Sequence, residues 1–339
     1  MTSLSRKNVV SNVNINEIAR RAGVSRATVS RYLNDGYVSQ QKRELIARVI
    51  EETGYVPSQR AQQLRTGRTQ LVGVVIPKIN SQSVSRMVAG ITATLASRGY
   101  QTVLASTENN EQVEVDYMET FSKRSRLDGI ILIGTVLTSR HREAIAELNM
   151  PLVVLAQKSD VSSCVYQDDY HAMHDITSLV LAKAKSPAYL GVFEEDVAAG
   201  LDRHRGFLDA CAQAGIEPAP EAQLVVGFDA DAGYFGAEQL LDTIEGLDTI
   251  VCATDDIAFG AMMCMMEYGK RVPEDVQITG VGDSLLSRIS RPSLTTVHLP
   301  YKTAGQRAAE SLLCQINTGV RDNCHIVMPY EVYVRNSMR

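Results

Sequence analysis

Residues 14–34 read NINEIARRAGVSRATVSRYLN, and this stretch decides the fold of the first part of the chain. Asn14 is a favourable helix N-cap, and Glu17 three residues later predicts a capping box at the start of a helix. Apolar residues follow at helical spacing, at Ile15, Ile18, Ala19 and Ala22. Gly23 tolerates the positive φ of a tight turn, and Ser25 can cap a second helix. The stretch therefore predicts two short helices joined by a turn.

A third helix is expected to complete this small domain. The second helix is predicted over residues 26–34, with Val29 and Leu33 facing inward. Ser39 can cap the third helix, and Gly54 can end it. Three short helices around one small core are typical of a helix-turn-helix unit, which places the N-terminal end of its second helix in the major groove of DNA.

The outward face of the second predicted helix carries side chains suited to DNA. Arg26 can bind the edge of a guanine with two hydrogen bonds, and the small Ala27 can lie against a thymine methyl group. Contacts with phosphates or neighbouring bases are expected from Thr28, Ser30, Arg31, Asn34 and, beyond the helix, Tyr37. Pairs of packed helices are common in proteins, so this pattern alone does not establish DNA binding.

Charge is distributed unevenly along the chain. Residues 1–68 contain 12 Lys and Arg against 5 Asp and Glu, although the whole chain has a net charge of −5. A basic head on an acidic body favours a domain that binds a polyanion. A basic surface without such a partner is the alternative when charge is considered alone.

The remainder of the chain alternates short β-rich runs with helix-length segments. Buried parallel strands are predicted over residues 71–76, 102–105, 129–133, 152–156, 188–192, 249–253 and 277–281. Alternation of this kind predicts a doubly wound α/β architecture, in which ligands bind beyond the carboxyl ends of the strands.

Composition and motifs disfavour several classes of protein. No apolar run reaches the 18 residues that a membrane span needs, and residues 1–14 lack the apolar stretch of a signal peptide. The six cysteines lack CxxC spacing, which favours reduced thiols and a cytoplasmic location. The sequence has no Gly-rich phosphate loop, no Gly-x-Ser-x-Gly elbow and no metal-spaced His/Cys set. No enzyme activity, cofactor or metal site is therefore expected.

Residues 18–34 closely resemble the signature of the LacI/GalR family of repressors. Val38-Ser39, Gly54-Tyr55-Val56-Pro57 and Ala61-Gln62-Gln63-Leu64 continue the match, and the resemblance then runs to the C-terminus. It implies an α/β protein with an N-terminal all-α helix-turn-helix headpiece (residues 1–58) and a two-lobed effector domain (70–339) that is similar to periplasmic binding proteins. Lobe 1 would comprise about 70–160 and 291–322, and lobe 2 about 161–290 and 323–339.

The resemblance also implies a hinge helix and linker over residues 59–69. So short a helix is marginal alone, and in the family it folds when two copies meet on DNA. Leu64 would wedge into a minor-groove step with Ala61 beside it, and such wedges kink the duplex. The alternative makes Leu64 an ordinary apolar residue that caps the next domain.

Several residues near strand ends match effector-binding positions of the family. They are Lys78, Gln157, Arg203, Phe228, Asp255 and Asp283. Planar polar side chains and aromatic rings suit sugars, because they bind hydroxyl pairs and cover C–H faces. Asp255 could instead be a helix N-cap, Arg203 a surface ion pair and Phe228 a core residue. In trehalose-type repressors, basic residues at the positions of Lys78 and Gln157 hold a sugar phosphate, so a phosphorylated effector stays open here.

These observations predict a dimeric repressor that binds a pseudo-palindromic DNA operator. A sugar or sugar phosphate would release it, and the regulated operon would serve carbohydrate use. No heptad tail follows the last strand, which favours a homodimer over a tetramer. The alternatives are a corepressor-dependent or activating regulator that responds to another metabolite and, in a different class, a sugar-binding transport protein, which the DNA-binding head disfavours.

Overall fold

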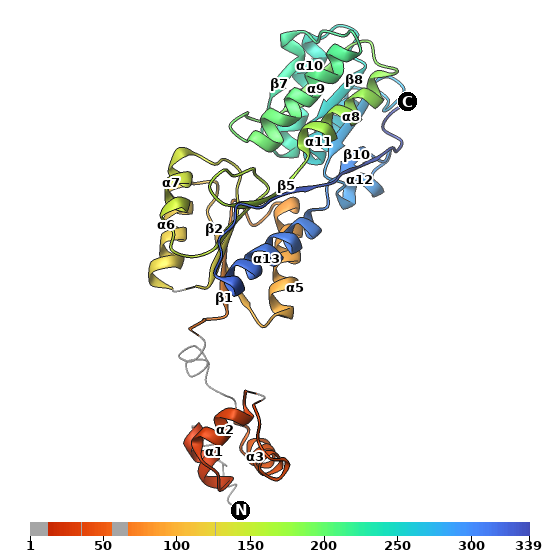
Figure 1. Cartoon of the computed structure of the whole chain (residues 1–339). Helices are drawn as coiled ribbons and strands as arrows, with labels where there is room; N and C mark the ends of the chain where they lie inside the picture. Colours follow the sequence, from red (N-terminus) through yellow and green to blue (C-terminus); the bar gives the residue numbers. More distant parts are fainter. Residues whose placement is uncertain (1–12, 35, 56–66, 126) are drawn as a thin grey trace, which may run out of the picture. The chain divides into compact units, whose positions relative to one another are not determined.

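The computed structural model describes residues 13–34, 36–55, 67–125 and 127–339 (Figure 1). The chain forms two compact units, Met1–Thr69 and Gln70–Arg339. None of the helices within the described ranges combines the length and the apolar character that a membrane crossing requires.

The first unit contains three helices around a small apolar core. They are α1 (Ile15–Arg21), α2 (Arg26–Tyr32) and α3 (Gln40–Thr53). The buried core residues are Ile18, Ala19, Ala22, Val29, Ile46 and Val49. The predicted helix-turn-helix arrangement is therefore present, although α2 ends two residues earlier than predicted.

The start of α1 differs in one respect from its prediction. Asn14 caps the helix, because its side chain accepts hydrogen bonds from the N–H groups of Asn16 and Glu17. The Glu17 carboxylate does not turn back to complete a capping box. It accepts hydrogen bonds from Arg20 Nε at 2.9 Å and Arg21 Nε at 2.7 Å, and these bonds lower the pKa of Glu17 to about 2. Two nearby cations compete successfully with one backbone N–H for this carboxylate.

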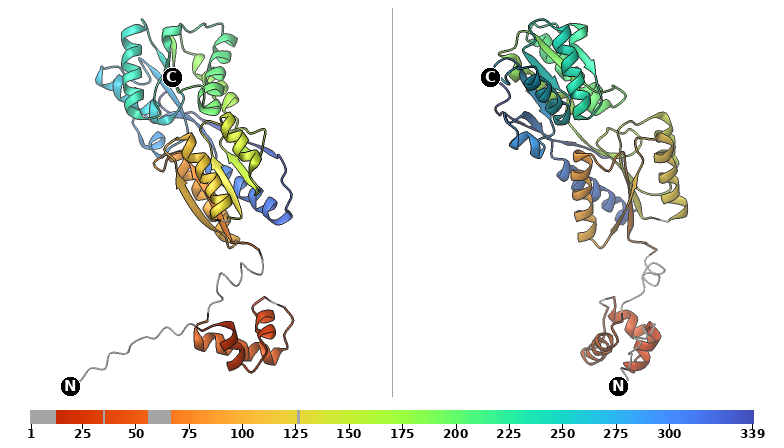
Figure 2. Two further views of the ribbon diagram at one scale, coloured as in Figure 1. Left: turned by 90° about the vertical axis from the view of Figure 1, so that its left-hand side faces the viewer. Right: turned by 180° about the vertical axis from the view of Figure 1, so that it is seen from behind.

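The second unit contains two lobes, each built on a six-stranded sheet. The lobe 1 sheet has the order β11-β5-β4-β3-β1-β2, and all its neighbouring strands are parallel. Its strands are β1 (Leu71–Ile76), β2 (Gln101–Ser106), β3 (Gly129–Ile133), β4 (Leu152–Leu155), β5 (Ser163–Gln167) and β11 (His325–Met328). The helices α5 (Gln82–Ser97) and α13 (Tyr301–Thr318) pack together against one face, and α6 (Glu111–Glu119) and α7 (Ser139–Glu147) cover the other (Figures 1 and 2).

The lobe 2 sheet has the order β12-β10-β9-β8-β6-β7, with only β12 antiparallel to its neighbour. Its strands are β6 (Pro187–Gly191), β7 (Gln223–Val225), β8 (Thr249–Cys252), β9 (Gln277–Val281), β10 (Thr295–His298) and β12 (Glu331–Tyr333). Its helices are α8 (Asp169–Leu181), α9 (Arg203–Gln213), α10 (Ala230–Thr243), α11 (Asp255–Glu267) and α12 (Leu285–Ile289), and a π-helical turn, η2 (Val197–Asp202), precedes α9.

The chain crosses between the lobes later than the sequence predicted at all three places. β5 and β11 pair with each other and with β4 in the lobe 1 sheet, whereas the predicted boundaries placed them in lobe 2. β10 lies in the lobe 2 sheet, beside β9, whereas lobe 1 was predicted to resume at residue 291. In each case the chain completes a strand, which satisfies its backbone hydrogen bonds, before it leaves the lobe.

Two glycines allow α5 and α13 to pack with their backbones in direct contact. A Cβ atom at Gly90 would overlap the carbonyl oxygen of Lys302, and one at Gly305 would overlap the carbonyl oxygen of Met87. Both helices also contribute residues to the cavity lining, Met87 from α5 and Tyr301 from α13, so their spacing helps to fix lobe 1.

We expect Gly90→Ala to lower the free energy of unfolding by about 1–3 kcal/mol, because the new methyl group must push α13 away from α5. Thermal unfolding of the full-length protein, followed by circular dichroism, measures the change. Ala89→Ser changes an exposed neighbour on the same helix and serves as the control. Equal shifts for both variants would show that the close helix contact is not the cause.

Candidate functional site

The start of α2 presents the side chains that the sequence assigned to DNA. Ser25 caps the helix by accepting a hydrogen bond from Thr28 N at 3.2 Å, and its hydroxyl also pairs with that of Thr28 at 2.9 Å. Exposed side chains on or beside the helix are Arg26, Ala27, Arg31, Asn34 and Tyr37, while Thr28 and Ser30 are half-buried. Arg26 and Ala27 therefore stand free at the helix end that enters a DNA groove in such units.

Two further predicted DNA contacts cannot be placed. Ala61 and Leu64 lie outside the described residues, together with most of the predicted hinge. Their roles at a minor groove stay predictions from the sequence.

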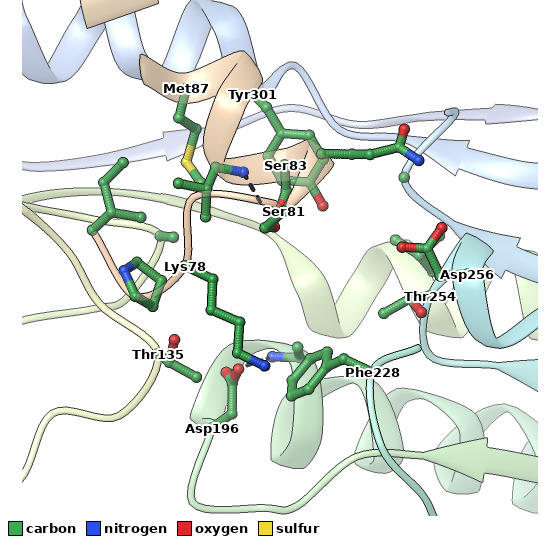
Figure 3. A pocket seen from close by; sticks show the side chains of 18 of the residues that line it. Lys78, Ser81, Ser83, Met87, Thr135, Asp196, Phe228, Thr254, Asp256 and Tyr301 are labelled. Carbon is green, nitrogen blue, oxygen red and sulfur yellow. Dashed lines mark hydrogen bonds between the residues drawn. The ribbon is translucent and has the colours of Figure 1, made fainter. Parts of the chain in front are cut away.

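A cavity of about 370 Å³ opens between lobe 1 and lobe 2 of the second unit. The cavity is lined by five of the six predicted effector residues, Lys78, Gln157, Arg203, Phe228 and Asp255. Each follows the carboxyl end of a strand or begins the next helix, as expected for a doubly wound fold. Figure 3 shows Lys78 pointing across the cavity toward Asp196 and Phe228. The volume is at the lower end of the range for small-molecule sites.

Arg203 forms a buried ion pair at the cavity wall. The Arg203 and Asp169 residues are only 5% and 3% exposed. Arg203 donates from Nε (2.8 Å) and Nη2 (2.6 Å) to Oδ1 of Asp169, and from Nη1 to the carbonyl oxygen of Ala253. The ion pair of Arg203 is therefore buried, not at the surface. Its guanidinium group is fixed between α8 and the end of β8.

Asp255 does not cap α11; its carboxylate accepts hydrogen bonds from the loop after β9 and from β10. The N-cap of α11 is Thr254, whose hydroxyl accepts from Ile257 N. Asp255 Oδ2 accepts a hydrogen bond from Ser284 N at 2.8 Å, and Oδ1 accepts one from the Thr296 hydroxyl. Burial raises the pKa of Asp255, and these hydrogen bonds oppose the shift. The N-cap alternative is therefore wrong, and the carboxylate already has two partners within the protein.

Phe228 lies at the lobe 2 side of the cavity and is half-buried. Its ring meets the exposed Phe193 edge-on, with 5.6 Å between the ring centroids. A half-exposed aromatic face at a cavity wall differs from a core position, because it can cover the C–H face of a ring-shaped ligand.

Asp283 is not part of the cavity, which corrects its prediction as an effector residue. Its carboxylate accepts hydrogen bonds from Arg288, Arg335 (2.6 Å) and His298 (3.0 Å). Burial alone would raise the pKa of Asp283, but the hydrogen bonds from these three groups outweigh it and lower the pKa to about 2. Gly282 occupies the cavity wall instead, and three cationic or hydrogen-bonding partners hold Asp283 behind it.

The structure adds two cavity residues that the sequence reading did not single out. Asp196 is 5% exposed and accepts hydrogen bonds from Gln157 Nε2 at 2.7 Å and Ala199 N at 3.0 Å. Gln167 ends β5, and its buried Nε2 has no hydrogen-bond partner within the described part of the chain. A buried donor without a partner is costly, so a ligand oxygen or a water is the expected partner.

Comparisons with known protein families agree with both units. Residues 14–58 match the model described as bacterial regulatory proteins, lacI family. Residues 176–338 match the model of a periplasmic binding protein-like domain.

Relatives with similar full-length sequences are transcriptional regulators. The sucrose operon repressor of Staphylococcus xylosus is 33% identical over 300 residues, which cover 88% of this chain and 92% of that protein. The transcriptional regulator RegA of Clostridium saccharobutylicum is 31% identical over 327 residues, covering 95% and 98%.

Solved structures of similar architecture include a complex of the transcriptional regulator CelR with cellobiose. It has a TM-score of 0.73 and 26% identity, and it covers 96% of this chain and 100% of that chain. The lac repressor dimer bound to operator has a TM-score of 0.86 at 24% identity, which shows a shared fold.

Proposed function

Because the chain belongs to the LacI family of bacterial regulatory proteins, we propose that it represses a carbohydrate-utilisation operon and leaves its operator when a sugar or sugar phosphate fills the cavity. The chain is a DNA-binding transcriptional regulator of this family. Its relatives include a sucrose operon repressor, and a similar structure holds cellobiose, which supports a carbohydrate effector.

The observation that carries the effector proposal is the composition of the cavity wall. An aromatic face at Phe228 of lobe 2 lines the same cavity as polar groups of lobe 1, including Lys78, Gln157 and the unpartnered Gln167 Nε2. Rings with several hydroxyl groups need this combination of an apolar face and many hydrogen-bonding groups. Since the wall comes from two lobes, a ligand there can favour one lobe arrangement over another. It changes operator affinity only by that differential binding.

The operator-binding form is proposed to be a homodimer on a pseudo-palindromic site. Operators of this symmetry mirror two-fold proteins. The second unit exposes large apolar side chains that a partner copy can cover, namely Leu285, Leu286 and Ile289 of α12 and Met263 and Met266 of α11. DNA binding also supports a cytoplasmic location, where the bacterial operator is found.

Base contacts are assigned in this proposal to Arg26 and Ala27, which stand exposed at the start of α2. Thr28, Ser30, Arg31, Asn34 and Tyr37 are assigned to phosphates or neighbouring bases. Ala61 and Leu64 are assigned to the minor groove on the sequence alone.

The effector proposal is tested by fluorescence anisotropy of a labelled duplex that the full-length protein has selected from random DNA. A panel of sugars and sugar phosphates is added to the complex, and one of them should lower operator affinity. Phe228→Ala should then raise the effector concentration needed for release by about tenfold, because a buried aromatic contact is lost. Operator affinity without effector should not change.

Phe235→Ala is the matched control, since Phe235 is an exposed phenylalanine of the same lobe, outside the cavity. A small molecule that tightens operator binding would instead support the corepressor alternative. A similar increase in the effector concentration needed for release in both variants would show that Phe228 does not contact the effector.

A further inference from the structure

We propose that the cavity selects uncharged sugars and rejects their phosphorylated forms, and that the hydrogen-bonded pair of Gln157 and Asp196 makes this selection. The inference rests on the proposed function, because it assumes that the cavity binds a carbohydrate. It narrows that function to one chemical class of effector.

The side-chain amide of Gln157 has no free donor hydrogen to offer a phosphate group. Its Nε2 donates one hydrogen to the carbonyl oxygen of Thr135 at 2.8 Å and the other to Oδ1 of Asp196 at 2.7 Å. An amide group has only two donor hydrogens, so just the acceptor oxygen is left. The side chain cannot rotate to change this without breaking both bonds, and Gln157 is only 5% exposed. A phosphate oxygen at this position would face an acceptor.

Asp196 adds a carboxylate to the same wall. The Asp196 side chain caps η2 through the Ala199 N–H group, which together with Gln157 fixes Oδ1. Within the described residues, Oδ2 accepts no hydrogen bond, although Asp196 lines the cavity. Oδ2 is therefore available to accept a hydrogen bond from a ligand hydroxyl. Burial raises the pKa of Asp196, and in its ionised form the carboxylate repels a deprotonated phosphate oxygen, which has no proton to donate.

Lys78 is the cation best placed to attract an anion, and it faces this carboxylate. Its amino group has no hydrogen bond or ion pair with any residue that the structure describes, and it points toward Asp196 and Phe228 (Figure 3). A phosphate near Lys78 would also lie near Asp196, so attraction and repulsion would act at similar range and largely cancel. A hydroxyl group gains from both side chains, because it accepts from Lys78 and donates to Asp196.

The other charged side chains of the cavity are more often acidic than basic. Arg203 is neutralised by Asp169, whereas Arg86 keeps its charge and donates through Nη1 to the carbonyl oxygens of Gly282 (2.8 Å) and Asp283 (3.4 Å). Asp229 and Asp256 add two more carboxylates to the lobe 2 wall. The lining as a whole contains three basic and five acidic side chains, which disfavours a dianion.

The N-terminus of α5 also reaches the cavity, and helix N-termini favour anions. Here the end is capped by the protein itself. The Ser81 hydroxyl accepts a hydrogen bond from Val84 N at 3.5 Å and pairs with the Ser83 hydroxyl at 3.0 Å. The partial charge of this end is smaller than the full charge of Asp196.

Isothermal titration of the full-length protein with matched pairs tests the inference. The pairs are sucrose and sucrose 6-phosphate, trehalose and trehalose 6-phosphate, and cellobiose and cellobiose 6-phosphate. In the pair that binds, the uncharged member should bind at least about tenfold more tightly, because the phosphate meets an unpaired like charge. Asp196→Asn keeps an acceptor for Gln157 and Ala199 and removes the charge. It should therefore reduce the ratio of the affinity for the uncharged sugar to the affinity for its phosphate by several fold.

Asp242→Asn makes the same chemical change at an exposed position of α10, outside the cavity, and should leave the ratio unchanged. If Asp196→Asn does not fold, the ratio of the two affinities in the unaltered protein still tests whether the cavity rejects phosphorylated sugars. A phosphorylated member that binds as tightly as its partner, or more tightly, would overturn the inference and leave the proposed function standing. Binding of neither member in any pair would contradict carbohydrate sensing itself, and the inference would fall with it.

Discussion

Replacing Arg203 with alanine should lower the free energy of unfolding of the second unit by about 3–5 kcal/mol. The variant would leave Asp169 buried without its cation, because Arg203 supplies both hydrogen bonds to Oδ1 of Asp169. It would also leave the carbonyl oxygen of Ala253 without this donor. Both losses act at the junction of α8, α9 and β8. Differential scanning calorimetry of the full-length protein measures the effect as a lower transition temperature of the larger unit.

Two comparisons separate a lost ion pair from a general loss of charge. Arg205→Ala removes an exposed arginine from the same helix and should change stability little. The double variant Arg203→Met and Asp169→Asn removes both charges and should recover part of the loss, because replacing a buried pair by uncharged groups costs less than breaking it. A double variant no more stable than Arg203→Ala would contradict this account.

Most of the fold followed from patterns that are local in the sequence. The caps at Asn14 and Ser25 start α1 and α2 where the sequence predicted them. β1, β3 and β9 have the predicted bounds. β1 and β3 are apolar runs that fit strands buried on both faces, and β9 is also fully buried although it contains Gln277 and Thr279. The strands that the sequence missed, β5, β7, β10 and β11, are short, and each contains at least one polar residue. Their pairing with distant segments, which local periodicity does not report, stabilises them.

The cavity could be predicted only in part, for a related reason. Lys78 and Gln157 follow predicted strands, so their placement depends on the fold class alone, whereas Phe228 follows β7, which was not predicted, and was assigned from the family resemblance. No local sequence pattern identified Asp196 as a site residue, because its role depends on a hydrogen bond with Gln157, which is 39 residues away in the sequence.

Asp283 shows the opposite error. It lies beside a strand end, where the fold predicts ligand contacts. However, its carboxylate already accepts a hydrogen bond from Arg335, which comes from the last residues of the chain. Such competition between a ligand and a distant side chain is a tertiary property. The sequence therefore predicts which loops form a site better than which side chains in them are free.

In the first unit, replacing Arg26 with alanine should reduce the preference for particular bases more than the general affinity for DNA. Arg26 is the first residue of α2, and its side chain is exposed directly after the Ser25 cap. One bidentate contact between arginine and guanine contributes about 10- to 100-fold of discrimination. We expect Arg26→Ala to weaken binding to the selected duplex by about that factor in competition anisotropy, and binding to random duplex much less.

The salt dependence of binding distinguishes this role from a phosphate contact. Losing one phosphate contact lowers the slope of log affinity against log salt by about 0.9, whereas losing a base contact leaves the slope nearly unchanged. Lys42→Ala, at an exposed position of α3, removes one positive charge from the same unit without altering α2. It should affect the selected and random duplexes equally. If Arg26→Ala behaves like Lys42→Ala, Arg26 binds the DNA backbone, and base reading must come from Ala27, Ser30 or their neighbours on α2.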